Sequence, residues 1–435
     1  MSGKNKIQKL NLKEKKWYYK GEGNVNLVLS IPDDCVVLRI IKIQHDEINI
    51  PIIEAERELL LQTNFYQVVS SVFFHNQYVN VPELMLIENI SIREINESVK
   101  HFRPKNRLHK IAGSKLVTVY PDYTLLLPKN VTVDKNYIVG SIYCAEIKPK
   151  QGWINEFERI GSKCVYCMNQ YLKISQGSID AISSYCPMDL FSGELMRMEK
   201  AVQSLLQTPQ NNLKLFKDGE PIAVNKFGSI INIAFKNNND FCTLIVSALV
   251  KEFKNNVKHR YTIVTQPEDL NKLPTTDVEK SINNITFSGK SCNLSSINFL
   301  PQNCVLSYIL SMQKLQSTSF SSIYTEYKQK LKELSDYYYI ERLLSSITTC
   351  DKLCLDSFES YLIATTARDC SIYVTFCKVN PLMEDNEYVI NINDEFYLIN
   401  VHVGDLDPKP LSCIQKHYKR NVNVLNACLN YFKCS

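Results

Sequence analysis

The stretch Ala-Glu-Ile-Lys-Pro-Lys-Gln-Gly-Trp at residues 145–153 places one acid and two lysines around a proline. It follows Tyr-Ile-Val-Gly-Ser-Ile-Tyr-Cys at 137–144, whose β-branched and aromatic side chains predict a buried strand. Proline favours an extended conformation for the residue before it, and side chains alternate along an extended chain. We therefore expect Glu146, Lys148 and Lys150 to share one face, where two ammonium groups can converge on one anion. The alternative is an ordinary solvated strand edge with lysines.

The composition is that of a chain large enough for two lobes. It has 435 residues, of which 45% are hydrophobic, and this supports a substantial core. Fifty basic against 45 acidic residues give a net charge of +5, too weak a bias to predict nucleic acid or membrane as the main partner. An anion site in this chain must be a local cluster of basic residues.

The fifteen cysteines are scattered, and the closest pairs, Cys164/Cys167 and Cys350/Cys354, lack the paired repeats of a zinc ribbon. We expect reduced thiols, mostly in the core, in a cytoplasmic and/or nuclear protein. The charged N-terminus has no apolar segment typical of a signal peptide, and the uncharged apolar run at 241–250 is too short for a membrane span. Without heptad repeats, we expect a monomer.

The N-terminal part predicts strands around a glycine-rich turn. Residues 17–29 predict strand, turn and strand, with Gly-Glu-Gly-Asn-Val-Asn at 21–26. Glycines let backbone N–H groups approach a phosphate closely, as in the lid of a kinase-type nucleotide site, although hairpins of this composition are common. The next apolar strand, 35–42, carries Arg39 and Lys42, either of which could reach phosphates or face solvent. A helix is predicted from Pro51.

The middle of the chain is predicted to be mainly helical. The helical periods lie at 155–176, 194–207, 240–253, 303–315 and 321–346, and the polar stretch 271–298 predicts a flexible insertion. Asn211 and Asn212 stand in a turn before a strand. Adjacent asparagines commonly satisfy turn geometry, but they could also donate to a ligand.

Two acidic segments in the C-terminal third predict the chemistry. Residues 364–376 predict a loop that carries Asp369 into a strand, and a hairpin turning at Asn393-Asp394 returns a strand that ends at Asp405 and Asp407. Phosphoryl transfer needs one carboxylate to accept the proton of the attacking hydroxyl and another to hold Mg²⁺ against the nucleotide phosphates. Each acid alone could equally be an ordinary strand-end residue.

Taken together, these segments resemble the inositol-pentakisphosphate 2-kinase family, whose members make inositol hexakisphosphate from ATP. The resemblance covers nearly the whole chain in the family's order. Its motifs are GEGNVNLV from Gly21, VLRI from Val37, EIKPKQGW from Glu146, MDLFSG from Met188, TPQNNLKLF from Thr208, ARDCSI from Ala367 and DLDPKP from Asp405. The resemblance implies an α+β, two-lobed kinase-like fold, with an antiparallel-sheet N-lobe at 1–135 and a larger mixed C-lobe with an inositide-binding insertion at 136–435.

The resemblance also implies roles for individual residues, with ATP and Mg²⁺ as cofactors and inositol pentakisphosphate as substrate. Asp369 would accept the proton and Asp405 would bind Mg²⁺, assisted by Asp407. The nucleotide would contact Gly21, Glu22, Gly23, Asn24, Asn26, Arg39, Asp122, Glu146 and Asn211. The inositide would contact Arg103, Arg107, Lys148, Lys150, Asn212, Lys409 and Tyr418.

The chain departs from the family pattern at Cys167, Cys413 and His417, where some members have basic or aromatic residues. Some members also carry a zinc site of His and Cys before the catalytic acid; residues 321–347 contain neither residue type, so we predict no zinc. The alternative function is a catalytically silent inositide-binding scaffold. The two intact acids argue against it, because a protein that only binds polyanions gains nothing from them. A protein kinase is disfavoured because its catalytic motifs are missing from the sequence.

Overall fold

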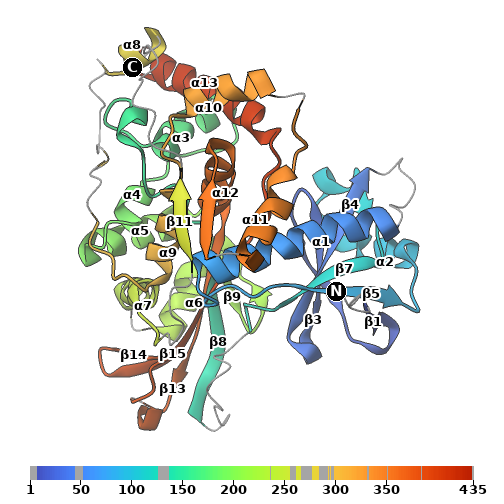
Figure 1. Cartoon of the computed structure of the whole chain (residues 1–435). Helices are drawn as coiled ribbons and strands as arrows, with labels where there is room; N and C mark the ends of the chain where they lie inside the picture. Colours follow the sequence, from blue (N-terminus) through green and yellow to red (C-terminus); the bar gives the residue numbers. More distant parts are fainter. Residues whose placement is uncertain are drawn as a thin grey trace.

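The computed structural model describes residues 7–44, 52–125, 137–235, 237–254, 261–265, 277–283, 292, 294, 298–330, 333–349, 351–383 and 385–433. Over these residues the chain is a mixed α/β protein with two large β-sheets, each with its own hydrophobic core (Figure 1). None of the described helices combines the length and the apolar character that a membrane crossing requires.

The N-terminal sheet has the strand order β1-β5-β7-β4-β3-β2, with β6 paired to β4. The described pairings are antiparallel except the parallel pair β1–β5. Alternating apolar residues of β3 and β4 (Leu27, Leu29, Leu38 and Ile40) are fully buried in its core. Its strands are β1 Gln8–Asn11, β2 Tyr18–Glu22, β3 Asn26–Ile31, β4 Val36–Gln44, β5 Glu83–Glu88, β6 Lys110–Ala112 and β7 Leu116–Pro121.

The second sheet has the strand order β10-β9-β8-β13-β15-β14, and its neighbouring strands are antiparallel. Strand β13 lies at its centre and pairs with β8 through Tyr373↔Glu146 and with β15 through Ser371↔Gly404. Its strands are β8 Ile138–Ile147, β9 Leu213–Lys217, β10 Glu220–Pro221, β13 Ser371–Val379, β14 Val389–Ile392 and β15 Glu395–Gly404. A small parallel sheet pairs β11 Thr262–Thr265 with β12 Lys352–Leu355.

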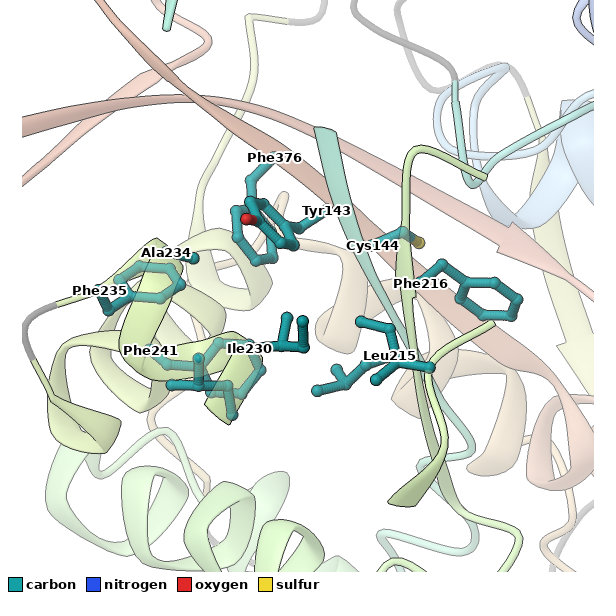
Figure 2. Close-up of a pocket in the computed structure, with 11 residues that line it drawn as sticks. Tyr143, Cys144, Leu215, Phe216, Ile230, Ala234, Phe235, Phe241 and Phe376 are labelled. Atoms are coloured by element: carbon teal, nitrogen blue, oxygen red, sulfur yellow. The ribbon is translucent and has the colours of Figure 1, made fainter. Parts of the chain in front are cut away.

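Helices cover the second sheet and build the larger part of the molecule in Figure 1. Figure 2 shows one such contact, where Phe235 and Phe241 lie near Phe376 of β13 in an apolar pocket beside Leu215. Its aromatic lining has no charged residue, so it is not a phosphate site. The helices are α1 Ile52–Val68, α2 Ile92–Val99, α3 Val165–Ser175, α4 Pro187–Leu190, α5 Leu195–Gln207, α6 Phe227–Ala234, α7 Asn238–Val250, α8 Asp277–Asn283, α9 Val305–Gln313, α10 Phe320–Lys330, α11 Tyr338–Thr349, α12 Ser357–Asp369 and α13 Cys413–Lys433.

Helix α1 connects the two parts of the chain. Phe65 on α1 packs edge-on against Tyr339 of α11 with ring centroids 5.9 Å apart, and Tyr66 meets Tyr120 of β7 at 5.6 Å. In Figure 1 the blue α1 therefore lies beside the orange α11. The N-terminal sheet is thereby fixed against α11.

Several predicted elements are confirmed, and others are wrong. The strand–turn–strand of the glycine segment, the strand through Arg39 and the hairpin turning at Asn393-Asp394 are all present. Residues 364–369 are the end of helix α12 rather than a loop, because a capping box of Asp356 and Glu359 starts a helix that continues to Asp369.

Two predicted helices are shorter than expected. The predicted helix at 155–176 begins only at Val165, after a turn through Gly161 with φ of 64°, and the one at 321–346 is divided between α10 and α11. The expected lobe boundary at 135 and most of the predicted insertion at 271–298 lie outside the described residues, apart from α8 and a few single residues.

Candidate functional site

The lysine-bearing turn follows directly after β8, which ends at Ile147. Our prediction that the chain stays extended through Lys150 is wrong, because Lys150 has a φ of 62° and the chain turns away from the sheet. The turn is held from behind: the Tyr185 hydroxyl donates to the Pro149 carbonyl at 2.7 Å, and Gln313 Nε2 donates to the Lys150 carbonyl at 2.9 Å. With its backbone fixed, the turn presents both lysine side chains in the same region.

The two acidic segments meet because β13 and β15 are neighbours. Asp369 is the last residue of α12 and is separated from β13 by Cys370 alone, and Asp405 follows the end of β15. Asp405 has a φ of 56°, which turns the chain out of the sheet. The Ser371 hydroxyl at the start of β13 donates to Asp405 Oδ2 at 2.7 Å. Sheet pairing thus places carboxylates from two distant segments beside each other.

These acids and the predicted cations form what we call the open ionic cluster. Lys150 Nζ lies 3.2 Å from Asp369 Oδ1, and Lys409 Nζ lies 3.0 Å from Asp369 Oδ2. Lys148 Nζ lies 3.1 Å from Asp405 Oδ2. The prediction that both lysines and both acids meet at one site is confirmed. The members of the cluster are Arg39, Lys148, Lys150, Asp369, Asp405, Asp407 and Lys409.

Arg39 joins the N-terminal sheet to this cluster. Its guanidinium lies 2.8 Å from Asp405 Oδ1 and 3.8 Å from Asp407 Oδ2, and it stacks over the Tyr120 ring at 4.6 Å. A planar guanidinium combines ring stacking with carboxylate binding. The cluster therefore draws residues from both sheets.

The cations control the protonation of the acids. Burial raises the pKa of Asp369, but Lys409 and Lys150 outweigh it and hold that pKa at about 2. The pKa of Asp405 is likewise far below its usual range, because Arg39 and Lys148 outweigh its burial. Burial raises the pKa of Asp407, and the negative charge of the neighbouring Asp405 carboxylate raises it further. Asp369 and Asp405 are therefore ionised at neutral pH.

The glycine hairpin rests on a second group, which we call the sealed ionic cluster: Glu22, Lys42 and Arg103. Arg103 Nε and Nη2 each donate to the Glu22 carboxylate at 2.9 Å, and Lys42 Nζ lies 2.5 Å from Glu22 Oε2. The three side chains are at most 2% exposed. Arg107 Nη1 also donates to the Glu22 carbonyl at 3.0 Å. In this structure Glu22 and Arg103 bind each other, which is not the ligand contact we expected of them from the sequence.

Two further predicted residues are engaged with protein groups. Asp122, buried at the end of β7, accepts from Lys20 and from the Thr124 hydroxyl at 2.6 Å. The Glu146 carboxylate accepts hydrogen bonds from Nζ of Lys214, its cross-strand partner on β9, at 2.9 and 3.0 Å.

The remaining predicted residues lie on the turn before β9 and on α13. Asn212 is buried and donates to the Tyr166 hydroxyl at 2.7 Å, whereas its neighbour Asn211 is exposed. Tyr418 stacks on Tyr324 with ring centroids 3.7 Å apart.

Three residues of this network were missed from the sequence. Ser371 also contacts Glu146 at 3.4 Å, so one hydroxyl connects Glu146 with Asp405. Lys214 could have been found from a cross-strand pairing with Glu146, had the β8–β9 register been known. Tyr66 contacts Asp407 at 3.5 Å and accepts from the Leu406 N–H at 2.9 Å, but nothing in a helix at residues 52–68 points to that partner.

The donor set fits a hard divalent cation. Asp405 and Asp407 supply carboxylate oxygens from the same short segment, and such oxygens are the ligands that Mg²⁺ prefers. A cation bound there would compete with Arg39 and Lys148 for Asp405.

The site combines an acid pair with three lysines and an arginine, and a glycine hairpin lies on the same sheet as that arginine. These are the parts of a phosphotransferase for an anionic substrate. Comparison with known proteins identifies the family. The model of the inositol-pentakisphosphate 2-kinase family matches residues 19–423, and the chain belongs to that family.

Three curated relatives match over nearly their full length. A protein of Danio rerio named inositol-pentakisphosphate 2-kinase is 27% identical, over 95% of this chain and 93% of its own. Proteins of the same name from Oryza sativa subsp. indica and Arabidopsis thaliana are 25% and 23% identical, over 95% and 94% of this chain and 93% and 92% of theirs. The chain is thus a kinase by family, and these comparisons give no support to a silent scaffold.

Proposed function

We propose that this chain transfers the γ-phosphoryl group of ATP to the 2-hydroxyl of inositol 1,3,4,5,6-pentakisphosphate, giving inositol hexakisphosphate. The observation that carries the proposal is the convergence of Lys148, Lys150 and Lys409 on Asp369 and Asp405. Five phosphates bring about ten negative charges, at roughly two each, so the substrate requires several cations in one place. The chain supplies them locally while its net charge is only +5.

We assign the nucleotide to the N-terminal side of the cluster. The backbone of the hairpin at Gly21, Gly23, Asn24 and Asn26 would cover the phosphates, and Arg39 would contact them. Glu22 and Arg103 support this hairpin from below, as the sealed ionic cluster, rather than touching either ligand. The two sheets would correspond to the N-lobe and C-lobe of a kinase-like fold, with the connection near Asp122.

Asp405, assisted by Asp407, would hold Mg²⁺, which neutralises charge on the transferred phosphoryl group. Asp369 would orient the attacking hydroxyl and accept its proton. A carboxylate with a pKa of about 2 is a weak base, but its pKa is low because Lys150 and Lys409 are bound to it. Substrate phosphates that attract both lysines would release Asp369 and raise its pKa toward a useful value. Substrate binding itself thus prepares the base.

The test is turnover and product regiochemistry. Purified protein is incubated with ATP, Mg²⁺ and inositol pentakisphosphate, and the product is examined by phosphorus NMR. We expect ADP and inositol hexakisphosphate in equal amounts, with the new phosphate on the axial 2-hydroxyl. Folded protein without turnover, or a product phosphorylated elsewhere, contradicts the proposal. Calorimetric binding of the inositide that is insensitive to ATP and Mg²⁺ would instead support a silent scaffold.

A further inference from the structure

A single buried amide joins the lysine-bearing turn to the helix that ends at Asp369. Gln313, the last residue of α9, is fully buried. Its Oε1 accepts from the Gly152 N–H at 2.8 Å, and its Nε2 donates to the carbonyls of Lys150 at 2.9 Å and Ala367 at 3.3 Å. A glutamine amide has one acceptor oxygen and two N–H donors, so these bonds engage both ends of the group.

This amide lies where the sheet no longer holds the two segments together. Strands β8 and β13 are antiparallel neighbours, and the last pair in their register toward the site is Ile147↔Ile372. Lys150 and Asp369 both lie beyond that pair. Pairing of these two strands therefore does not fix the distance between the two residues, although their side chains form an ion pair at 3.2 Å. Gln313 links the two backbone segments directly.

The conformation of the turn needs such a link. Lys150 has a φ of 62°, a region that residues with side chains occupy only where surrounding contacts enforce it. Gln313 binds the Lys150 carbonyl and the Gly152 N–H, which flank the residue that follows Lys150. A Cβ added to Gly152 would stand 2.1 Å from the Phe191 ring, so the turn is closely packed as well as hydrogen-bonded.

The ordinary role of a buried glutamine is to satisfy polar groups that water cannot reach, and Gln316 illustrates it in the segment after α9. This residue is 1% exposed, accepts from Arg368 Nη2 at 2.6 Å and donates to Glu158 Oε1 at 2.9 Å. Those bonds secure the end of α12. Gln313 differs because one amide binds the end of α12 and the lysine-bearing turn together.

We propose that Gln313 is a positioning residue, which sets the placement of Lys150 relative to Asp369 when the inositide binds. The proposal rests on the proposed function, in which substrate phosphates draw lysines away from that carboxylate. Lys150 then binds a phosphate while its backbone stays tied to the helix that ends at Asp369. The bound phosphate and the base therefore keep a fixed separation, and small displacements of such groups are costly to the rate.

Lys409 offers a matched comparison, because it binds the same carboxylate from another segment. Its Nζ lies 3.0 Å from Asp369 Oδ2, and its carbonyl accepts from the Tyr339 hydroxyl at 3.0 Å. Lys150 and Lys409 are equally exposed, at 22% each. They differ in that the first is held through Gln313 and the second through Tyr339.

The test is Gln313→Met, which removes the amide at nearly constant side-chain length. We expect KM for the inositide to rise about tenfold and kcat to fall about tenfold, while KM for ATP changes by less than about twofold. A double-mutant cycle then uses Kd for inositol pentakisphosphate, measured by calorimetry. In the Lys150→Met background the effect of Gln313→Met on Kd should shrink to less than about twofold, and in the Lys409→Met background it should remain about tenfold.

A second variant guards against loss of folding, because Gln313→Met leaves three buried backbone groups without their partner. Gln313→Asn retains an amide that is one methylene too short to bind the turn and the helix together. It should raise Kd by roughly threefold, with the same dependence on Lys150. Urea denaturation of both variants establishes that the affinities refer to folded protein. If Gln313→Met does not fold, the cycle is run with Gln313→Asn.

A purely structural role predicts a different pattern. Loss of buried hydrogen bonds alone would change Kd by the same factor in the wild-type, Lys150→Met and Lys409→Met backgrounds, and that outcome overturns the proposal. An unchanged Kd in folded Gln313→Met or Gln313→Asn also overturns it. Wild-type protein that shows the expected cycle but transfers no phosphate refutes the proposed reaction and leaves the positioning role standing. Wild-type protein that does not bind the inositide contradicts both.

Discussion

The open and the sealed ionic clusters have the same chemical composition at their centres, one carboxylate held by two cations, and differ in their access to water. In the sealed cluster Glu22 is 1% exposed, and Lys42 and Arg103 are each 2% exposed. In the open cluster Asp369 is 53% exposed, and Lys150 and Lys409 are each 22% exposed. Contact distances do not separate the two groups, since both lie within ordinary ion-pair range.

The difference shows which charges can change partners. Removing one member of a sealed cluster leaves a charge without compensation where water cannot reach it, so the group acts as a fixed support. An exposed pair contributes little to folding, because water and salt compensate its members. Its lysines can therefore leave the acid for a ligand phosphate at low cost. We assign support to the first cluster and ligand exchange to the second.

The largest effect is expected from removing the charge of the open carboxylate. Asp369→Asn should lower kcat about 1,000-fold, because the base that accepts the hydroxyl proton is lost. The same change should lower the unfolding free energy by less than about 1 kcal/mol, because the ion pairs are exposed. Single-turnover kinetics and urea denaturation measure the two quantities on the same preparation.

The control for this change is Asp394→Asn, an exposed aspartate in the β14–β15 turn with a φ of 63°, a conformation that asparagine tolerates well. It should leave both kcat and stability unchanged. Asp369→Asn with nearly full activity would show that the open cluster does not supply the base.

The second effect is expected from the sealed cluster, where a substitution should lower stability and leave ligand binding nearly unchanged. Glu22→Gln should lower the unfolding free energy by about 3 kcal/mol, because it leaves Lys42 and Arg103 buried without their counterion. Inositide affinity measured by calorimetry on the folded fraction should change little, since the lysines that we assign to the inositide lie in the open cluster. Urea denaturation measures the loss.

Glu88→Gln is the matched control, because Glu88 pairs with Lys9 at the surface, where the lysine side chain is 62% exposed. It should lower stability by less than about 0.5 kcal/mol. If Glu22→Gln proves as harmless as Glu88→Gln while nucleotide binding is lost, Glu22 contacts the ligand and the distinction between the two clusters fails.

Most of the strands and the functional residues at their ends could be predicted from the sequence. Strands β3, β4, β8 and β13 are rich in β-branched residues, and this local signal survives in the fold. The residues of the open cluster were also foreseen, because Lys148, Lys150, Asp369 and Asp405 each stand at the end of such a strand or of its predicted loop. Charged residues at the ends of predicted strands and loops can be recognised from the sequence alone.

Two features could not be read from the sequence, for different physical reasons. Helix α12 is buried at every position from Ser357 to Ala367, so it has no polar stripe and its helical period is invisible. The sealing of Glu22 depends on Arg103, 81 residues away. Burial belongs to the folded contacts, and a sequence alone does not distinguish a paired charge from a free one.

The smallest effect concerns His417, which lies beside the open cluster with its Nδ1 2.8 Å from the Tyr361 hydroxyl. Burial, together with the nearby Lys409 and Arg420, lowers the pKa of His417 to about 4. Between pH 6.5 and 4 the unfolded chain therefore binds a proton that the folded chain does not, so this residue makes stability fall as the pH falls through that window. His417→Gln should reduce the loss by about 1 kcal/mol after allowance for solvent screening, whereas the exposed His109→Gln should not. Urea denaturation at pH 7.0 and 4.5 measures the difference. An equal loss in wild type and His417→Gln would show that neither burial nor the nearby cations lower the pKa of His417 in the folded chain.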